Sequence, residues 1–375
     1  MDTPDNHSLD NHSKRDTLVH AGNDSPIYAK HDSLIHAGHG RSIHGEERSL
    51  LAISGLSTEY PTPRGTVHAV RDVDLVLGKG DILAIVGESG CGKSACLLSI
   101  MRLVPPPGRI VKGSIRFEDK ELLTLSQAEM RDLRGKDMAM VFQDPMTTLN
   151  PAYRVGEQIA ESLRVHGLLS GFPRRLLRKE REYERERVTD LLKQVGIPSP
   201  EHRHLEYPHQ FSGGMQQRIL IAIALACRPK VILADEPTTA LDVTVQAQVL
   251  DLMREINEEL GTAIILVTHD LGVAAEFCHT VAVMYAGQVV EFGDIQEVLS
   301  VPLHPYTRGL LKSIPQIGTR CELVPISGEV PDLANPTPGC SFAPRCEEAD
   351  SCCAKADPPL IVMDNGRKVR CHLYA

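Results

Sequence analysis

Eight residues written GESGCGKS have the pattern of a phosphate-binding loop: Gly87, Glu88, Ser89, Gly90, Cys91, Gly92, Lys93 and Ser94. The glycines allow successive backbone N–H groups to turn inward and form a nest for an anion. Lys93 would reach the β- and γ-phosphates of a nucleoside triphosphate, and the Ser94 hydroxyl would bind Mg²⁺. The alternative, a glycine-rich turn followed by a chance Lys-Ser pair, would not require a strand before it and a helix after it.

Two adjacent carboxylates, Asp235 and Glu236, end the run VILADE further along the chain. They stand at the carboxyl end of a predicted buried strand, where α/β sheets keep their ligands. Asp235 would hold Mg²⁺ directly or through its bound water, and Glu236 would orient and deprotonate an attacking water. A carboxylate at the end of a strand is common by itself. The evidence for a catalytic site is that these two carboxylates occur together with a phosphate-binding loop. Together the two motifs predict hydrolysis rather than transfer to a substrate hydroxyl.

Short apolar runs must position these groups, and four of them predict buried strands: 82–86, 138–142, 231–234 and 263–267. The first of these precedes the loop, and the helical run SACLLSIMRLV follows it, as the motif requires. Residues 243–260 keep helical apolar spacing, and Gly261 is expected to end this helix. Strands alternating with helices predict an α/β fold with a largely parallel core sheet.

The composition argues against nucleic-acid-binding, membrane-spanning and secreted classes of protein. The formal net charge of −9 argues against a dedicated nucleic-acid binder, which usually presents a basic surface. The longest apolar run, residues 219–227, is about half of the roughly 20 residues that cross a bilayer. The N-terminus has no basic segment followed by an apolar one, so no signal peptide is expected. We therefore expect a reducing compartment, in which structural disulfides are rare.

Three other segments differ in composition from the predicted strands and helices of this core. Residues 1–48 hold seven of the 16 histidines in imperfect repeats and predict a disordered tail, with metal binding as the less favoured alternative. Residues 151–210 read as helical and strongly charged, which favours a solvated helix face over a membrane-surface role. After Phe292 prolines and cysteines accumulate, which marks an appended C-terminal extension, residues 293–375.

The run FSGGMQQR, residues 211–218, resembles the signature motif of ATP-binding cassette (ABC) ATPases. Other family motifs occur in order: Tyr60 matches the aromatic residue that stacks on adenine, Gln143 the Q-loop, Asp242 the D-loop and His269 the switch histidine. The resemblance implies an ABC-type fold over residues 49–292, with a RecA-like core, an antiparallel β subdomain and a helical subdomain at about 151–215. Phe211 and Met215 replace the Leu and Gln of the common LSGGQ motif, but the Ser-Gly-Gly core is intact.

The resemblance also implies a mechanism in which two subunits enclose two nucleotides head to tail. The signature residues of one subunit would cap the γ-phosphate on the partner's loop; they are Ser212, Gly213, Gly214, Met215 and Gln216. His269 would sense the γ-phosphate, and Gln143 would join Ser94 and Asp235 as a Mg²⁺ ligand. The catalytic set would be Glu236, His269, Gln143 and Lys93. Closure of the pair is a two-state switch biased by ligand contacts, and the helices after Gln143 would transmit it to a membrane partner.

The run VPLHPYTRGLLKSIP, residues 301–315, resembles the extension of oligopeptide and dipeptide importer ATPases. This implies an ATPase that powers peptide uptake from the cytoplasmic face of the cell membrane as a peripheral subunit. Its partners would be a second, related ATPase subunit, two transmembrane permease subunits and an extracytoplasmic solute-binding protein, with no nucleic acid. Nickel and oligosaccharide importers share much of this pattern and stay open as alternatives.

Two other classes are less compatible with the sequence. Soluble cassette proteins that act on DNA or ribosomes usually carry two cassettes or a long coiled coil, and neither is seen here. A small-molecule kinase would leave the signature motif and His269 without a role.

Six of the ten cysteines fall within the last 55 residues. The spacing of Cys340, Cys346, Cys353 and Cys371 resembles the iron–sulfur extension of some peptide-importer ATPases, and four thiolates suit a [4Fe–4S] cluster. Zinc is the alternative, although the usual closely spaced cysteine pairs are missing. Cys352 would be a spare neighbour, and disulfides are disfavoured in a reducing compartment.

Overall fold

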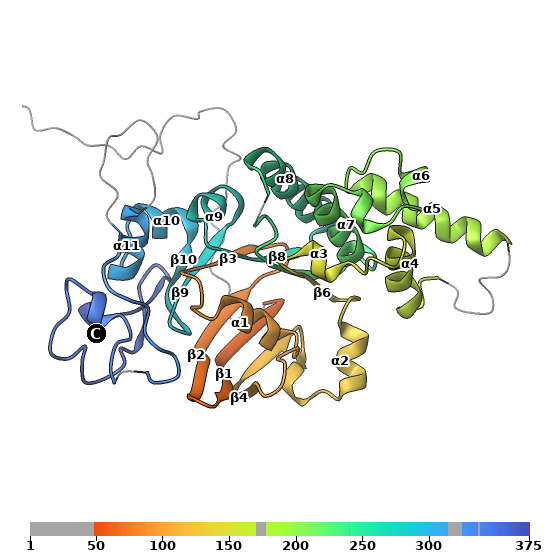
Figure 1. Ribbon diagram of the computed structural model, residues 1–375. Coiled ribbons are helices and arrows are strands. Elements are labelled where there is room, and N and C mark those ends of the chain that lie inside the picture. The colour runs from red at the N-terminus through yellow and green to blue at the C-terminus, as the bar shows by residue number, and fades with distance from the viewer. Residues whose placement is uncertain (1–48, 170–177, 240, 314–324, 337) are drawn as a thin grey trace, which may run out of the picture. The chain divides into compact units, whose positions relative to one another are not determined.

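The computed structural model describes residues 49–169, 178–239, 241–313, 325–336 and 338–375, all of which belong to one compact unit (Figure 1). The predicted histidine-rich tail, residues 1–48, lies outside the described residues. Within the described ranges no helix combines the length and the apolar character needed to cross a membrane.

The central sheet has eight strands in the order β11-β12-β10-β9-β3-β8-β7-β6. Its parallel part consists of β3 (Ile82–Val86), β8 (Ala263–Thr268), β7 (Val231–Asp235), β6 (Met138–Val141) and β9 (Thr280–Tyr285). Four of these strands are the predicted ones, each within one residue of its expected ends. The predicted α/β fold with a parallel core sheet is confirmed.

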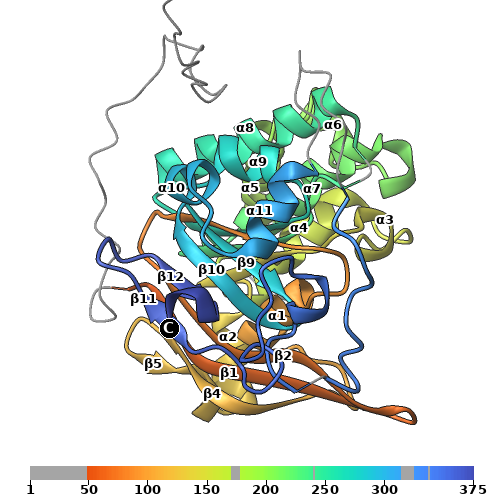
Figure 2. The ribbon, with the colours of Figure 1, turned by 90° about the vertical axis from the view of Figure 1, so that its left-hand side faces the viewer.

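The other edge of this sheet is antiparallel. β10 (Gln288–Asp294) pairs with β9, and two short strands, β12 (Lys368–Arg370) and β11 (Leu360–Val362), continue the sheet. Glu291 of β10 stands opposite Val369 of β12. The C-terminal extension is therefore joined to the core sheet by strand pairing, and Figure 2 shows it beside β9 and β10.

A second, antiparallel sheet has the order β2-β1-β4-β5. Its strands are β1 (Leu51–Thr62), β2 (Gly65–Leu77), β4 (Arg109–Phe117) and β5 (Lys120–Glu121). The Thr58 and Ser99 hydroxyls lie 2.7 Å apart and join β1 to the helix that follows the phosphate-binding loop.

Helices occupy the connections. They are α1 (Lys93–Ile100), α2 (Gln127–Leu133), α3 (Pro145–Thr148), α4 (Val155–Val165), α5 (Arg178–Gln194), α6 (Pro200–Arg203), α7 (Gly213–Leu225), α8 (Val243–Leu260), α9 (Leu271–Phe277), α10 (Ile295–Ser300) and α11 (Pro305–Lys312). Short 3₁₀ helices are η2 (Leu122–Thr124), η4 (Pro208–Gln210), η5 (Ala343–Arg345) and η6 (His372–Tyr374). α8 has the predicted bounds, and Gly261 caps it at φ 65°, a conformation that favours glycine.

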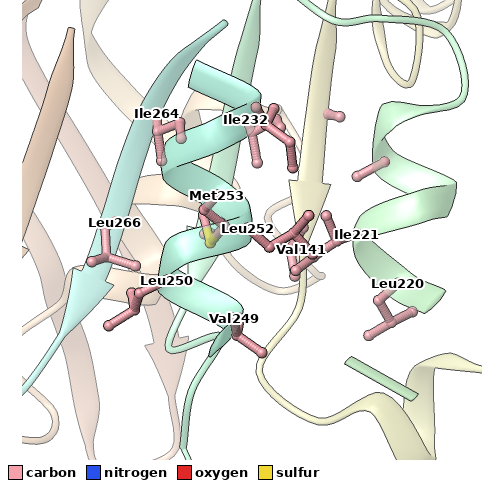
Figure 3. Packing of buried hydrophobic residues seen from close by; sticks show 14 of the residues in the cluster. Val141, Leu220, Ile221, Ile232, Val249, Leu250, Leu252, Met253, Ile264 and Leu266 are labelled. Atoms are coloured by element: carbon pink, nitrogen blue, oxygen red, sulfur yellow. The ribbon is translucent and has the colours of Figure 1, made fainter. Parts of the chain in front are cut away.

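Side chains of the parallel strands alternate between two buried layers, because successive strand residues point to opposite faces. On one face Ala84, Ile232 and Ile264 pack against the helices α7 and α8. Figure 3 shows Val249, Leu252 and Met253 of α8 in this layer. On the other face Leu83, Leu233 and Ile265 pack in one cluster with residues of α1 and the antiparallel sheet. Each fully buried Leu or Ile of this kind stabilises the fold by about 1.5–3 kcal/mol.

Candidate active site

The loop of residues 87–94 joins β3 to α1 and turns tightly. Gly92 has φ 105°, and a Cβ atom there would come within 2.1 Å of the Ala69 carbonyl oxygen. A Cβ atom on Gly87 would come within 2.2 Å of the Met284 carbonyl oxygen. Close packing of backbone on backbone therefore requires glycine at both positions, and it fixes the loop between β2 and the end of β9.

Lys93 is buried, and its ammonium lies within the curve of the loop. Nζ donates hydrogen bonds to the carbonyl oxygens of Gly87 (2.8 Å) and Glu88 (3.0 Å). A phosphate oxygen is a stronger acceptor for an ammonium than a neutral carbonyl is. The side chain is thus placed where an anion held by the loop would meet it.

Ser94 and Asp235 are brought together by the side-by-side packing of α1 and the end of β7. The Ser94 hydroxyl donates a 2.9 Å hydrogen bond to Asp235 Oδ1. Burial raises the pKa of the Asp235 carboxyl, and the Ser94 hydrogen bond opposes that rise. A hydroxyl and a carboxylate oxygen are the hard oxygen ligands that Mg²⁺ prefers, so this pair fits the predicted magnesium site.

Glu236 is the centre of the second group of predicted residues. Its Oε2 accepts hydrogen bonds from Gln143 Nε2 (3.2 Å) and Thr239 Oγ1 (2.8 Å), and His269 Nδ1 lies 3.4 Å away. The Gln143 amide nitrogen is therefore directed at Glu236, and the predicted role of Gln143 as a Mg²⁺ ligand stays a prediction. Glu236 itself has φ 45°, a left-handed conformation that non-glycine residues rarely adopt and that clusters at functional sites.

The strand order explains why these residues meet. Gln143 follows β6, Glu236 follows β7, and His269 follows β8, while the phosphate-binding loop follows β3. These are neighbouring parallel strands, so their carboxyl ends form one edge of the sheet. Thr239 was not among the predicted residues; its only sequence signal is a hydroxyl three positions after Glu236.

The remaining predicted residues lie on other elements. Tyr60 is in β1, and a Cβ atom on Gly108 would come within 2.4 Å of its ring. Ser212 caps α7, and Asp242 caps α8, where it accepts the Val245 N–H at 3.0 Å. Each cap satisfies a helix N–H group that has no partner within its helix.

The two glycines and the glutamine of the signature run lie in the first turns of α7. A Cβ atom on Gly214 would come within 2.3 Å of the Val245 side chain, so α7 and α8 touch there. Gln216 is buried and donates hydrogen bonds to the carbonyls of Pro208 and Phe211, so it has a structural role within the chain. The predicted contact with a second subunit stays a prediction.

Two of the four predicted cysteines of the extension are joined through their backbones, because the Cys340 N–H donates to the Cys353 carbonyl at 2.8 Å. Burial raises the pKa of Cys340 to about 11, and the Cys353 and Cys371 thiols add to that rise. Burial also raises the pKa of Cys371, with additions from Cys346 and Cys353. Among the described residues, however, no three His, Cys, Asp or Glu side chains form a group that could hold a metal ion. The expected metal site, whether iron–sulfur or zinc, is therefore not confirmed.

Two family models match the chain. Residues 70–239 match the family described as ABC transporter, and residues 290–353 match the oligopeptide/dipeptide transporter C-terminal region. The chain is 48% identical over 326 residues to the dipeptide transport ATP-binding protein DppD of Bacillus subtilis, a match that covers 86% of this chain and 94% of the relative. It is also 48% identical over 324 residues to the oligopeptide transport ATP-binding protein OppD of the same organism, covering 86% and 88%.

Solved structures give the same result for the fold. The dimeric structure of MJ0796, a bacterial ABC transporter cassette, has 29% sequence identity and a TM-score of 0.57. The match covers 65% of this chain and 98% of the cassette. A second structure of MJ0796, in a dimeric post-hydrolysis state bound to ADP and phosphate, matches with 28% identity and the same TM-score and coverage.

Proposed function

Because the chain belongs to the ABC transporter ATPases that carry the oligopeptide/dipeptide transporter C-terminal region, we propose that it powers the import of di- and oligopeptides. It is an ATPase, which converts ATP and water to ADP and phosphate. The observation that supports ATP hydrolysis is the carboxylate of Glu236, held by Gln143, Thr239 and His269 directly after Asp235, which pairs with Ser94. The likeness to peptide-transport ATP-binding proteins supports the assignment to peptide import.

The chemistry follows from the placement of the side chains. Lys93 and the N–H groups of the loop would bind the β- and γ-phosphates, and Ser94 and Asp235 would hold Mg²⁺. Mg²⁺ held by this pair would neutralise part of the negative charge of the phosphates. Glu236 accepts a proton from the water that attacks the γ-phosphate, and its three neighbours fix the direction of the carboxylate. Tyr60 would stack on the adenine ring.

Two subunits are proposed to enclose the nucleotides head to tail. Ser212, Gly213 and Gly214 of one subunit would approach the γ-phosphate bound to the other, and Asp242 would lie at the same interface. His269 would sense the γ-phosphate. The dimeric post-hydrolysis state of MJ0796 with ADP and phosphate supports such an arrangement.

ATPase subunits of peptide importers work at the membrane with transmembrane permeases and a solute-binding protein. We propose a complex in which this chain and a second, related ATPase subunit bind two permease subunits at the cytoplasmic face, with the solute-binding protein on the other side. The division into a tail (1–48), an ATPase domain (49–292) and an extension (293–375) belongs to the same proposal.

We also propose that the extension binds a [4Fe–4S] cluster through Cys340, Cys346, Cys353 and Cys371. Tetrahedral zinc with Zn–S bonds of about 2.3 Å would draw its thiolates to within about 3.8 Å of one another. A four-iron cluster is larger and keeps its four thiolates further apart. The Cys353 and Cys371 thiols raise the pKa of Cys340, and the Cys346 and Cys353 thiols raise that of Cys371, so the proposed ligands influence one another's charge. The cluster would supply structural or regulatory function, since ATP hydrolysis needs no redox centre.

Uptake assays test the transported solute directly. Cells that carry the complete transporter should accumulate labelled di- and oligopeptides, and cells in which Glu236 is replaced by Gln should not. Accumulation of Ni²⁺ or an oligosaccharide in place of peptides would overturn the peptide assignment and leave the ATPase assignment intact.

A further inference from the structure

The C-terminal extension contacts Glu88 of the phosphate-binding loop through two of its side chains. The guanidinium of Arg345 makes a bidentate ion pair with the Glu88 carboxylate, with Nη1–Oε2 at 2.8 Å and Nη2–Oε1 at 3.0 Å. The hydroxyl of Tyr306 accepts a hydrogen bond from the Glu88 backbone N–H at 3.0 Å. Bidentate pairs of this kind fix geometry as well as charge, because two parallel hydrogen bonds define one orientation.

Arg345 is itself held rigidly. Its side chain is only 4% exposed, its Nε donates to the Ser327 carbonyl at 3.0 Å, and its guanidinium lies 5.8 Å from the centre of the Tyr285 ring. The hydrogen bonds to Glu88 raise the pKa of the guanidinium, so its charge is retained. An arginine fixed by several partners cannot follow a moving carboxylate, so it restrains that carboxylate.

Tyr306 is restrained by aromatic packing. Its ring is fully buried, with ring centres 4.5 Å from Tyr285 and 5.4 Å from Phe342. Burial raises the pKa of its hydroxyl, which therefore stays protonated and neutral. Phe342 and Arg345 belong to the same segment of the extension, so one aromatic cluster supports both contacts with Glu88.

Glu88 is thus held on three sides. Arg345 binds its carboxylate, Tyr306 accepts its N–H, and its carbonyl oxygen accepts from Lys93 Nζ at 3.0 Å. Lys93 is the side chain proposed to meet the phosphates. We propose that Arg345 and Tyr306 are positioning residues for nucleotide binding, which hold the loop in the shape that presents Lys93 and the backbone N–H nest to ATP.

This inference rests on the assignment of the loop to ATP. Neither residue touches the reacting atoms, so the proposal predicts an effect on ATP binding rather than on the chemical step. Because loss of a charge-assisted pair typically costs about tenfold in an equilibrium constant, Arg345→Gln should raise the KM for ATP about tenfold and leave kcat within about twofold. Tyr306→Phe removes only the hydroxyl and should raise the KM about threefold.

A double-mutant cycle on the full-length chain in its transporter complex gives the test. Glu88→Gln, Arg345→Gln and the double variant are assayed for KM and kcat of ATP hydrolysis, with binding of a fluorescent ATP analogue as a second measurement. The proposal predicts that the double variant raises KM by clearly less than the product of the two single effects. Arg345→Lys keeps the positive charge but loses the bidentate geometry. Its KM for ATP should therefore lie between those of wild type and Arg345→Gln.

Glu348→Gln is the matched control, because it breaks the ion pair of Arg308 with Glu348 on the same extension. Its KM should equal that of wild type. Multiplicative effects of Glu88→Gln and Arg345→Gln, or an unchanged KM in Arg345→Gln and Tyr306→Phe, would overturn the proposal. If Arg345→Gln does not fold, Tyr306→Phe and Arg345→Lys carry the same test. Wild-type protein that fails to bind ATP would instead contradict the assigned function.

Discussion

His269 Nδ1 lies 3.4 Å from Glu236 Oε2, the same oxygen that accepts hydrogen bonds from Gln143 and Thr239. The three partners come from three different connections of the sheet. A carboxylate held in this way keeps one direction, which is the requirement for a base that must meet a water beside the γ-phosphate.

Replacing Glu236 by Gln removes the base but keeps the shape of the side chain. We expect the rate of phosphate release to fall by about 10²–10⁴-fold, which is the usual contribution of a general base. The affinity for ATP should stay within a few-fold of wild type, because the phosphate-binding residues are untouched. A hydrolysis rate equal to that of wild type would rule out Glu236 as the base.

Thr239 should act through Glu236. Thr239→Val removes the hydroxyl that donates at 2.8 Å to Oε2, and we expect kcat to fall about tenfold while the KM for ATP is unchanged. Thr239→Ser keeps a hydroxyl and should retain most of kcat. Equal rates for the Val and Ser variants would show that the hydrogen bond does not orient the carboxylate.

His304 should make the folded protein sensitive to acid. Burial lowers its pKa from 6.5 to about 3, with the nearby Arg308 acting in the same direction. Below pH 6.5 His304 is protonated in the unfolded chain but stays neutral in the folded protein. The free energy of unfolding therefore falls as the pH falls, down to about pH 3. Each pH unit in that window costs about 1.4 kcal/mol.

His304→Asn isolates this effect. Asparagine offers an oxygen acceptor for the Tyr306 N–H, which His304 Nδ1 accepts at 3.0 Å, but it does not titrate. Between pH 6.5 and about 5 the variant should therefore lose about 2 kcal/mol less than wild type in its free energy of unfolding. Denaturant titrations across this range measure the difference, and parallel profiles for the two proteins would contradict the prediction.

The cysteines of the extension should carry iron. Protein purified without oxygen is expected to be brown, with about four irons per chain and absorbance near 400 nm. Cys353→Ala should lose most of the iron, whereas Cys352→Ala is the matched control and should keep it. Colourless protein with one equivalent of zinc would favour the zinc site, and equal iron in the two variants would exclude the proposed ligand set.

Local sequence patterns predicted the parts of the fold that local interactions decide. Residues 82–86 are apolar throughout because β3 is buried on both faces, and 243–260 repeat their apolar residues at helical spacing because one side of α8 covers the sheet. The predicted active-site residues Gln143, Glu236 and His269 follow such strands directly. Their convergence follows from the parallel order of those strands.

The contacts between Glu88 and the extension could not be predicted in the same way. Tyr306 and Arg345 lie 218 and 257 residues further along the chain from Glu88. Which residues meet over such distances depends on the packing of the whole extension. The pairing of β12 with β10 is similar: three residues, Lys368–Arg370, are too few to show a strand period.

The most direct test of the central claim is ATP hydrolysis by the reconstituted transporter in vesicles, measured with and without peptide-loaded solute-binding protein. We expect hydrolysis to rise severalfold with the peptide-loaded protein and to fall by about 10²–10⁴-fold in the Glu236→Gln variant. A hydrolysis rate that is the same with and without peptide-loaded solute-binding protein, or that rises with Ni²⁺ instead, would contradict the claim that this chain powers peptide import.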